Sequence, residues 1–492
     1  MITTILILIP LAAAAVLTVA PLSRLHTEVF ALAATLAEIV VGAVALAQFS
    51  TGQGMQFVTD RVWISDFVLG TPVRYHVGMD GLGLFMMLLT AVGIAASVGA
   101  GIRAGRDRPR AYYGLVLLLE AALVLLFTAQ DLVLFYVGWE VMMIPLFILM
   151  AVWGGEGRRA ATIRFVIYTM VGSLLMLVAI AAIGIRYHTF EVSQVHSGAA
   201  WIFFFFAAAF CIKAPLFPLH GWMPAAYRES APETTALLSG VISKAGAYGL
   251  LRFCLPMFPG PAHDWRWLFL GLALVGLLYG SLLAFRQADA RGVVAYSSLG
   301  QMNLIVIGIF ALNSNGSTGA IFQMVNHGLV SLAAFLVIGL IELRAGKDGF
   351  RWLGGLANGR PRFSTVLLIA AMFMLAVPGS SAFVSELYIL IGAFQQQAWL
   401  GAVAACAIVL AAMYALRWFS ALAHGQNGER VTDETADLRP HELMIAVPLI
   451  VILLALTVYP FGVMNRVKDY HPVTPTPYTT TLGGQASGGD GG

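Results

Sequence analysis

Apolar stretches of about 20 residues recur along almost the whole length of this 492-residue chain. Stretches of that length and character cross a lipid bilayer as helices. Only 11% of the residues are charged, against roughly 25% in soluble domains. The sequence therefore predicts an all-α integral membrane protein with about fourteen transmembrane helices. The expected spans are residues 2–20, 28–49, 80–102, 112–130, 131–153, 161–185, 200–221, 233–255, 265–286, 291–312, 317–342, 363–396, 398–422 and 441–463.

The two ends of the chain differ in character. The first span has no basic residues before it and another apolar run directly after it, so we expect an uncleaved helix rather than a signal peptide. Residues 471–492 are rich in proline, threonine and glycine, and we expect them to be disordered.

Two of the expected spans are interrupted by proline and glycine. The seventh contains Pro215 and Pro218, and the twelfth contains Pro378-Gly379. A break at membrane depth is tolerated only where protein or a wet cavity surrounds it. The breaks fall in the fourth helix of two five-helix blocks, helices 4–8 and 9–13, which is the layout of inverted repeats in transporters.

We therefore expect two inverted five-helix repeats around a buried site. The chain then divides into four parts: the N-terminal helices 1–3 (residues 1–111), the first repeat (112–260), the second repeat (261–424), and a polar loop with helix 14 and the tail (425–492).

Basic residues are unevenly distributed between the two ends of the expected helices. Most lie in loops after odd-numbered helices, and the loops after even-numbered helices hold only Arg61, Arg74, Arg186, Arg252 and Arg266. By the positive-inside rule, the richer side is cytoplasmic. Both termini are then expected on the outer side of the membrane.

Two of the four lysines in the chain, Lys213 and Lys244, lie inside long apolar stretches. A charged side chain at the centre of a membrane helix costs about 2.5–3.5 kcal/mol on insertion scales. A buried lysine can release its proton, whereas arginine keeps its proton. Two lysines at membrane depth therefore point to proton handling.

Carboxylates and histidines also fall inside the expected spans. They are Glu140 in span five, Glu386 after the break in span twelve, His327 in span eleven, Glu38 and Glu120 in spans two and four, and His220 at the break of span seven. A single buried glutamate often only bonds a neighbouring carbonyl or hydroxyl, and we favour that structural interpretation slightly for Glu38 and Glu120. For His220 the structural and functional interpretations weigh equally.

The structural interpretation explains Glu140, Lys213 and Lys244 poorly, because three unlike charges on separate helices are costly unless they pair. We expect Glu140 and Lys213 within ion-pair reach, about 3–6 Å apart or joined through one water. A carboxylate beside a lysine keeps the lysine protonated, and its withdrawal releases the proton. Glu386 is expected to face the protein interior beside the break rather than lipid.

Cofactor and nucleotide motifs are missing from the sequence. Cys211, Cys254 and Cys406 lie far apart, so we expect no metal, no iron–sulfur centre and no disulfide in this chain. No Walker A or GxGxxG segment supports a nucleotide site. The net charge of +3 gives no reason to expect nucleic acid as a partner.

Several motifs resemble one family closely. The run from Lys213 to Pro224, KAPLFPLHGWMP, and the run from Ser243 to Arg252, SKAGAYGLLR, resemble the central signature of the proton-translocating antiporter-like subunits of respiratory complex I. Phe135-Tyr-Val-Gly-Trp-Glu140 with Pro145, Ala295-Tyr-Ser-Ser298 and His327-Gly328 fit that family's fifth, tenth and eleventh helices. The resemblance covers most of residues 80–420, and its motifs are highly specific.

The resemblance implies a role for each buried group. Glu140 and Lys213 would form a switching pair, Lys244 the central relay, His327 a hydrated link and Glu386 the terminal proton donor. The glutamate in Phe383-Val-Ser-Glu386 resembles one branch of the family, the M-type subunits, because sister subunits and cation/proton antiporters usually carry lysine there. Additional relay positions would be His220, Gln301 and Glu120.

Two departures from the family pattern concern the proton route. The family often has Ser-His in its tenth helix, where this chain has Gly300-Gln301, so a relay there would run through water held by Gln301. The usual Pro-Asp-Ala-His is Pro224-Ala-Ala-Tyr227 here, without a loop carboxylate or histidine. The routes by which protons reach and leave the central axis therefore stay open.

The resemblance implies a proton-pumping membrane-arm subunit of NADH:quinone oxidoreductase in a bacterial cell membrane, with both termini periplasmic. Its partners would be the other membrane-arm subunits, including sister antiporter-like subunits, while flavin, iron–sulfur clusters and quinone would belong to partner subunits. The alternative is a subunit of a multi-subunit sodium/proton antiporter or of a membrane-bound hydrogenase, which share the fold; Glu386 argues against the antiporter. A structural scaffold would not explain the buried charges.

Overall fold

The computed structural model describes residues 1–346, 348–432 and 434–468, and it is predominantly helical, as the sequence predicted. The expected disorder of residues 471–492 lies outside these residues. Within the described part, 11 helices are long and apolar enough to cross a membrane. They are α1 (Ile2–Val19), α2 (Arg24–Gln48), α3 (Gly81–Ala104), α4 (Pro109–Thr128), α5 (Leu132–Trp153), α6 (Arg158–Tyr187), α13 (Arg266–Arg286), α14 (Ala290–Phe310), α15 (Ser314–Ala345), α19 (Ala398–Ala423) and α20 (Pro440–Val458).

The other three expected spans are divided, two of them where proline and glycine predicted a break. The seventh is α7 (Ala200–Lys213), which ends at Lys213 and is followed by turns and α8 (Met223–Glu229). The twelfth consists of α17 (Pro361–Met374) and α18 (Ser381–Gln396), with Pro378-Gly379 between them.

The eighth span was expected to be continuous, and the structure differs. It contains α9 (Pro232–Leu237), α10 (Lys244–Gly249) and α11 (Leu255–Met257), separated by the π-helical segments Leu238–Ile242 and Leu250–Cys254. The π-helical segments flank Lys244 and the turn that follows it, and no proline within them indicates their position in the sequence. Such π-bulges occur frequently at functional sites. Short helices α12 (Pro259–Asp264), α16 (Phe350–Leu353), α21 (Phe461–Val467) and a 3₁₀ turn (Val192–Gln194) complete the helical elements.

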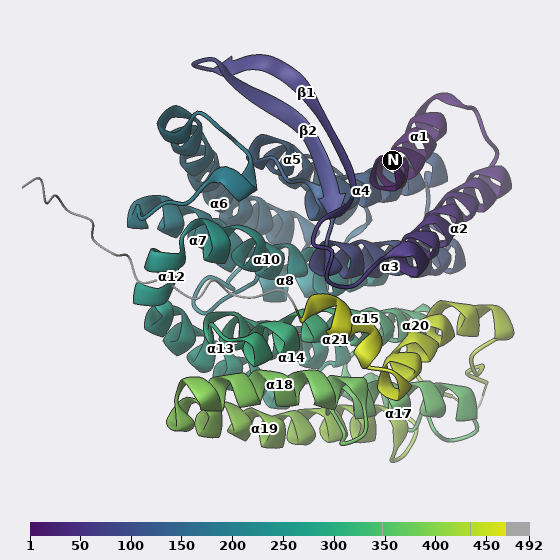
Figure 1. Cartoon of the computed structure of the whole chain (residues 1–492). Helices are drawn as coiled ribbons and strands as arrows, with labels where there is room; N and C mark the ends of the chain where they lie inside the picture. The colour runs from purple at the N-terminus through teal and green to yellow at the C-terminus, as the bar shows by residue number, and fades with distance from the viewer. Residues whose placement is uncertain (347, 433, 469–492) are drawn as a thin grey trace, which may run out of the picture.

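An antiparallel hairpin, β1 (Gln56–Val68) and β2 (Thr71–Met79), lies between α2 and α3 and was not predicted. Its register pairs Thr59 with Val77 and Arg61 with Tyr75. Figure 1 shows it as two long arrows along one edge of the molecule. Val73 and Val77 of β2 are fully buried, and β2 packs against α1, α3, α4 and α5.

Polar side chains cap α5, α15 and α18, which carry Glu140, His327 and Glu386, and they also cap α14. Asp131 accepts hydrogen bonds from the first amides of α5, and Asp289 and Asn313 do the same for α14 and α15. Ser380 caps α18 immediately after the break. These caps satisfy amide groups that have no intrahelical partner, and so fix where each helix begins.

Helix α15 forms the buried centre of the molecule. Its apolar window is fully buried, and it packs against α3, α9, α14, α18 and α20. Figure 1 shows α1 to α7 in the upper part of the view and α13 to α19 in the lower part. The inverted repeat and the four-part division of the chain stay predictions.

Ion pairs join the ends of these central helices. Arg106 pairs with Glu233 at 2.5 Å, and Arg291 pairs with Glu342 at 2.5 Å. These pairs connect the loop after α3 to α9, and α14 to α15. Two of the arginines that predicted the cytoplasmic side therefore also tie neighbouring helices together.

Candidate functional site

Glu140 lies on α5 and faces α6. Ser173 on α6 donates a hydrogen bond to the Glu140 carboxylate, and the same hydroxyl lies 3.3 Å from the Tyr136 hydroxyl. Since Ser173 and Tyr136 are neutral, the carboxylate is solvated by hydroxyl groups rather than by a direct ion pair. Ser173 was not predicted from the sequence.

Lys213 is the last residue of α7 and is fully buried. Its Nζ lies 3.0 Å from the Met143 sulfur, 5.4 Å from the centre of the Trp139 ring and 5.3 Å from that of Phe165. Thioether sulfur is a weak acceptor, and the two rings offer cation–π attraction.

Glu140 is close enough to act electrostatically on Lys213, but these two described residues form no ion pair of 4.0 Å or less. The expected separation of 3–6 Å or a bridging water therefore stays a prediction. The lysine stands poorly solvated beside a carboxylate that it does not touch, an arrangement in which a small movement changes the strength of the pair.

The break that follows Lys213 is held by Asn303 of α14. The Asn303 side chain donates to the Pro215 carbonyl (3.3 Å) and accepts from the Phe217 amide (3.4 Å). Trp222 donates to the Ile212 carbonyl at 2.8 Å. These contacts satisfy backbone groups that the proline-rich turn leaves unpaired. Asn303 was missed in the sequence, although it is a polar residue inside an apolar span.

Lys244 and His327 are in direct contact. The fully buried Lys244 Nζ lies 2.9 Å from His327 Nδ1 and 2.5 Å from the Ser239 carbonyl. Ser331 contacts the other ring nitrogen, Nε2, at 3.1 Å. With a protonated lysine as donor, Nδ1 accepts and Nε2–H donates to Ser331. Lys244 and His327 are thus joined by one hydrogen bond rather than by a water.

A small cavity lies between His327 and Glu386. Its volume is about 20 Å³, and its lining includes Gln301, Gln323, His327, Ser331 and Glu386. That volume suits one water molecule, and the lining offers several polar partners for it. Glu386 is 4% exposed, which confirms the prediction that it faces the interior.

Two glutamines hold Glu386 in this position. Gln301 donates to Glu386 Oε1 at 2.9 Å, and Gln323 donates to Gln301 Oε1 at 2.7 Å. Ser385 donates in turn to Gln323 Oε1 at 2.5 Å. Gln301, which replaces a titratable residue of the family pattern, is therefore a direct partner of Glu386. Gln323 was missed in the sequence.

The remaining predicted residues, His220, Glu38 and Glu120, form no hydrogen bond or ion pair with the ionisable groups described above. His220 stacks near Phe217 and Tyr279, with ring centres 5.6 and 5.4 Å away, and its Nδ1 has no hydrogen-bond partner. Glu38 and Glu120 are fully buried, and none of their carboxylate oxygens has a partner. The structural interpretation favoured for both glutamates, a bond to a carbonyl or hydroxyl, is therefore wrong.

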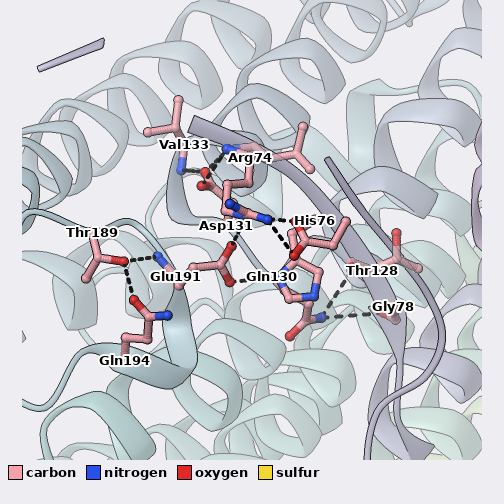
Figure 2. Close-up of polar contacts among 12 residues, drawn as sticks. Arg74, His76, Gly78, Thr128, Gln130, Asp131, Val133, Thr189, Glu191 and Gln194 are labelled. Carbon is pink, nitrogen blue, oxygen red and sulfur yellow. Dashed lines mark hydrogen bonds and ion pairs between the residues drawn. The ribbon is translucent and has the colours of Figure 1, made fainter. Parts of the chain in front are cut away.

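A second polar cluster anchors the hairpin and is drawn in Figure 2. Arg74 binds Asp60 through two contacts of 2.8 Å, and its amide donates to Asp131 at 3.1 Å. His76 Nδ1 lies 2.7 Å from Glu191. The hydrogen bond to Glu191 raises the pKa of His76, and the hydrogen bond from Arg74 lowers the pKa of Asp60.

The same cluster has the donor set of a metal site, because ligand atoms of Asp60, His76 and Glu191 lie within 4.8 Å of one another. Arg74 already pairs with Asp60 and lies 3.5 Å from Glu191. A guanidinium at the centre of the ligand set opposes a cation, so the cluster fits a structural anchor. The three cysteines are free.

The geometry thus provides a row of ionisable groups: the half-buried Glu140 on α5, and the buried Lys213, Lys244, His327 and Glu386 on α7, α10, α15 and α18. Each can take up or release a proton; hydroxyl groups solvate Glu140, and amide and hydroxyl groups line the cavity between His327 and Glu386. Fold and buried charges together define a multi-span membrane protein of the class that moves protons or small cations.

Comparison with known proteins places the chain within that class. The chain belongs to the family described as NADH:quinone oxidoreductase/Mrp antiporter, transmembrane, whose model matches residues 129–411. NADH-quinone oxidoreductase subunit M of Rhodobacter capsulatus is 34% identical and covers 95% of this chain and 96% of its own length.

Two solved structures share the fold. A chain of respiratory complex I from Thermus thermophilus matches with a TM-score of 0.85 and 29% identity, over 96% of this chain and 99% of its own length. A chain of the Mrp complex from Dietzia sp. matches with a TM-score of 0.83 over 96% of this chain and 97% of its own length, and at 22% identity it shows the fold alone.

Proposed function

We propose that this chain is the M-type antiporter-like subunit in the membrane arm of an NADH:quinone oxidoreductase, and that it carries protons across the membrane. The redox chemistry, with its flavin, iron–sulfur clusters and quinone, belongs to partner subunits. The proposal is supported by the family, by the relatives named subunit M, and by the row of buried ionisable groups. In the assembly, other membrane-arm subunits and lipid surround the chain.

The single observation that carries the proposal is the polar connection from Lys244 to Glu386. It consists of the 2.9 Å contact between Lys244 and His327 and the small cavity between His327 and Glu386. A proton leaving Lys244 would pass to His327 Nδ1 while Nε2–H releases one towards the cavity. One water there would carry the proton to the Glu386 carboxylate, which Gln301 holds in place.

Glu140 and Lys213 would control the supply of protons to this connection. While Glu140 stays near, its charge favours the protonated form of Lys213. When the α5–α7 contact loosens, the poorly solvated ammonium of Lys213 loses its counter-charge and gives up its proton. The break after Lys213, fixed by Asn303, gives α7 an end that can move relative to α5 without bending a continuous helix.

The orientation of the chain follows from its arginines. We propose that the end of α3 and the loop after it, with Arg103 and Arg106, face the cytoplasm, and that the hairpin and both termini face the periplasm.

The test uses the intact complex in vesicles, with proton uptake measured against NADH oxidation. Glu386→Gln is expected to abolish most of the uptake, because an amide cannot carry a proton between the cavity and the exit. Glu429→Gln, a change at an exposed residue paired with Arg351 on the surface, is the matched control and should leave uptake unchanged. Normal uptake in an assembled Glu386→Gln complex would contradict the proposal.

The second candidate, a subunit of a sodium/proton antiporter, is favoured only by the shared fold. It predicts that a sodium gradient alone, without NADH, moves protons across vesicles. The complex I assignment predicts that proton movement requires NADH and quinone, and that flavin and iron–sulfur subunits co-purify with the chain.

A further inference from the structure

Two carboxyl groups, Glu38 on α2 and Glu120 on α4, stand outside the row of groups described above. Both side chains are fully buried, and all four of their oxygens lack a hydrogen-bond partner. The two residues are close enough to act on each other electrostatically. Buried polar atoms without any partner are rare in native proteins, and each calls for an explanation.

No cation neutralises the pair. Helix α1, which packs against both α2 and α4, has no ionisable side chain. The only one on α3 is Arg103, which pairs with Glu442. The other ionisable groups on α2 and α4 lie in the first turns: Arg24, His26, Glu28, Arg110, Tyr112 and Tyr113.

The ionisable side chains on the other elements packed against α4 also have partners. Glu140 on α5 accepts from Ser173, and Lys244 on α10 contacts His327. Tyr248 on α10 donates to the Phe127 carbonyl. On β2, Arg74 and His76 are bound to Asp60 and Glu191. Among the described residues, the charged groups on the elements packed against α2 and α4 therefore leave Glu38 and Glu120 without a counter-charge.

A bound metal cation fits these surroundings poorly. Hard cations take six or more oxygen ligands, and the pair offers four oxygens. One turn along α2 from Glu38, a Cβ on Gly42 would meet the side chains of Leu88 and Met87 at 3.0 and 3.5 Å. In such an apolar environment two like charges side by side are strongly unfavourable, and the ligand that removes them is the proton.

The pair also stands at the level of the central row. On the antiparallel helices α4 and α5, Gly138 lies against Ala122 and Leu126. Glu120 is therefore within about one helical turn of the level of Glu140. Glu140 faces α6 through Ser173, whereas Glu120 faces α2, so the two carboxyl groups occupy opposite sides of the same helix pair.

We propose that Glu38 and Glu120 form a buried proton-binding site, which holds its protons in the resting complex and exchanges one of them with the Glu140 side during turnover. In the exchange an O–H bond of the pair breaks and an O–H bond forms on the Glu140 carboxylate; in the reverse step the O–H bond on Glu140 breaks and the O–H bond of the pair forms again. The inference rests on the proposed function, since turnover means proton pumping by the complex. The site would act as a local proton reserve beside the switching pair.

Infrared difference spectroscopy of the assembled complex tests the resting state directly. Subtracting the spectrum of the Glu38→Gln/Glu120→Gln variant from that of the unchanged complex should leave bands of protonated carboxyl groups, and no ionised carboxylate bands. The matched control is Glu28→Gln on the same helix, where Glu28 is paired with Arg24; its difference spectrum should show ionised carboxylate instead. Ionised carboxylate bands from the pair would overturn the proposal and indicate a bound cation.

A second spectrum, NADH-reduced minus oxidised, tests the exchange. It should contain a deuterium-sensitive carboxyl band that both single variants, Glu38→Gln and Glu120→Gln, weaken and the double variant abolishes. A spectrum in which that band is absent, or is unchanged by the substitutions, would overturn the exchange. Should the double variant fail to assemble, the single variants decide the same question. The resting spectrum needs no turnover, so it stands even if Glu386→Gln refutes the proposed pumping.

Discussion

Asn303→Leu should loosen the break that follows Lys213. The change removes the donor to the Pro215 carbonyl and the acceptor of the Phe217 amide, at 3.3 and 3.4 Å, while keeping a side chain of similar size. Leaving one buried backbone group unsatisfied costs about 1–3 kcal/mol. The equilibrium constant for opening of the break would then rise by roughly 5- to 150-fold.

Cys211 can report that opening, because it is already present beside the break and no cysteine has to be introduced for labelling. It lies two residues before Lys213 and is 2% exposed, while Cys254 is fully buried and Cys406 is exposed. In the assembled complex, Cys211 should react with a membrane-permeant maleimide roughly 5- to 150-fold faster after Asn303→Leu. Mass spectrometry of the labelled peptides separates the three cysteines.

The controls make the result specific. Cys406 should be labelled equally in all samples, and Cys254 should stay protected. Asn315→Leu, at a half-buried asparagine that bonds Gln395, should leave Cys211 protected. An unchanged Cys211 rate in the Asn303→Leu complex would show that Asn303 does not hold the break.

Two further predictions follow from the glutamine contact and the hairpin anchor. Gln301→Leu removes the side chain that donates to Glu386 at 2.9 Å. Because a hydrogen bond to a charged group contributes about 1.5–3 kcal/mol, this variant should slow NADH-driven proton uptake by at least tenfold. Gln301→His keeps a donor and should retain most of the uptake, and equal rates in both variants would count against this contact. Because its bond to Glu191 raises the pKa of His76, the stabilisation is complete below the unfolded value near 6.5 and is lost as the pH rises through the folded value. The protection of β2 amides from hydrogen exchange, compared with a His76→Gln complex at each pH, should therefore show a difference that shrinks towards alkaline pH, and a difference that grows would refute the assignment.

The helical plan could be read from the sequence because apolar length and proline act locally. The spans at α3 and α14 fall within a few residues of their predicted ends, and the breaks after Lys213 and at Pro378 lie where proline placed them. The hairpin was missed because polar residues interrupt the apolar residues of Gln56–Met79, so the segment has no apolar run long enough to cross a membrane and is typical of a loop between helices. The π-helical segments around Lys244 were missed because they arise from packing against neighbouring helices, and no residue type marks them.

The site was predictable at the level of charge and unpredictable at the level of contacts. A lysine or glutamate within an apolar stretch can be identified from the sequence alone, so Glu140, Lys213, Lys244 and Glu386 were all predicted as candidates. Which groups touch depends on how α10, α14, α15 and α18 meet, so the Lys244–His327 bond could not be derived from spacing. Uncharged partners such as Gln323 carry a weaker insertion penalty and gave no comparable signal.

The central claim is that Lys244 relays protons, and one measurement tests it most directly. In vesicles containing the assembled complex, NADH-driven proton uptake and quinone reduction are compared for the unchanged chain, Lys244→Ala and Lys244→Arg, with the exposed Lys468→Ala as control. The account predicts near-complete loss of uptake with alanine and poor rescue with arginine, because arginine keeps the charge beside His327 but does not release its proton. A fully assembled Lys244→Ala complex that pumps at the normal rate, or full activity with arginine, would contradict it.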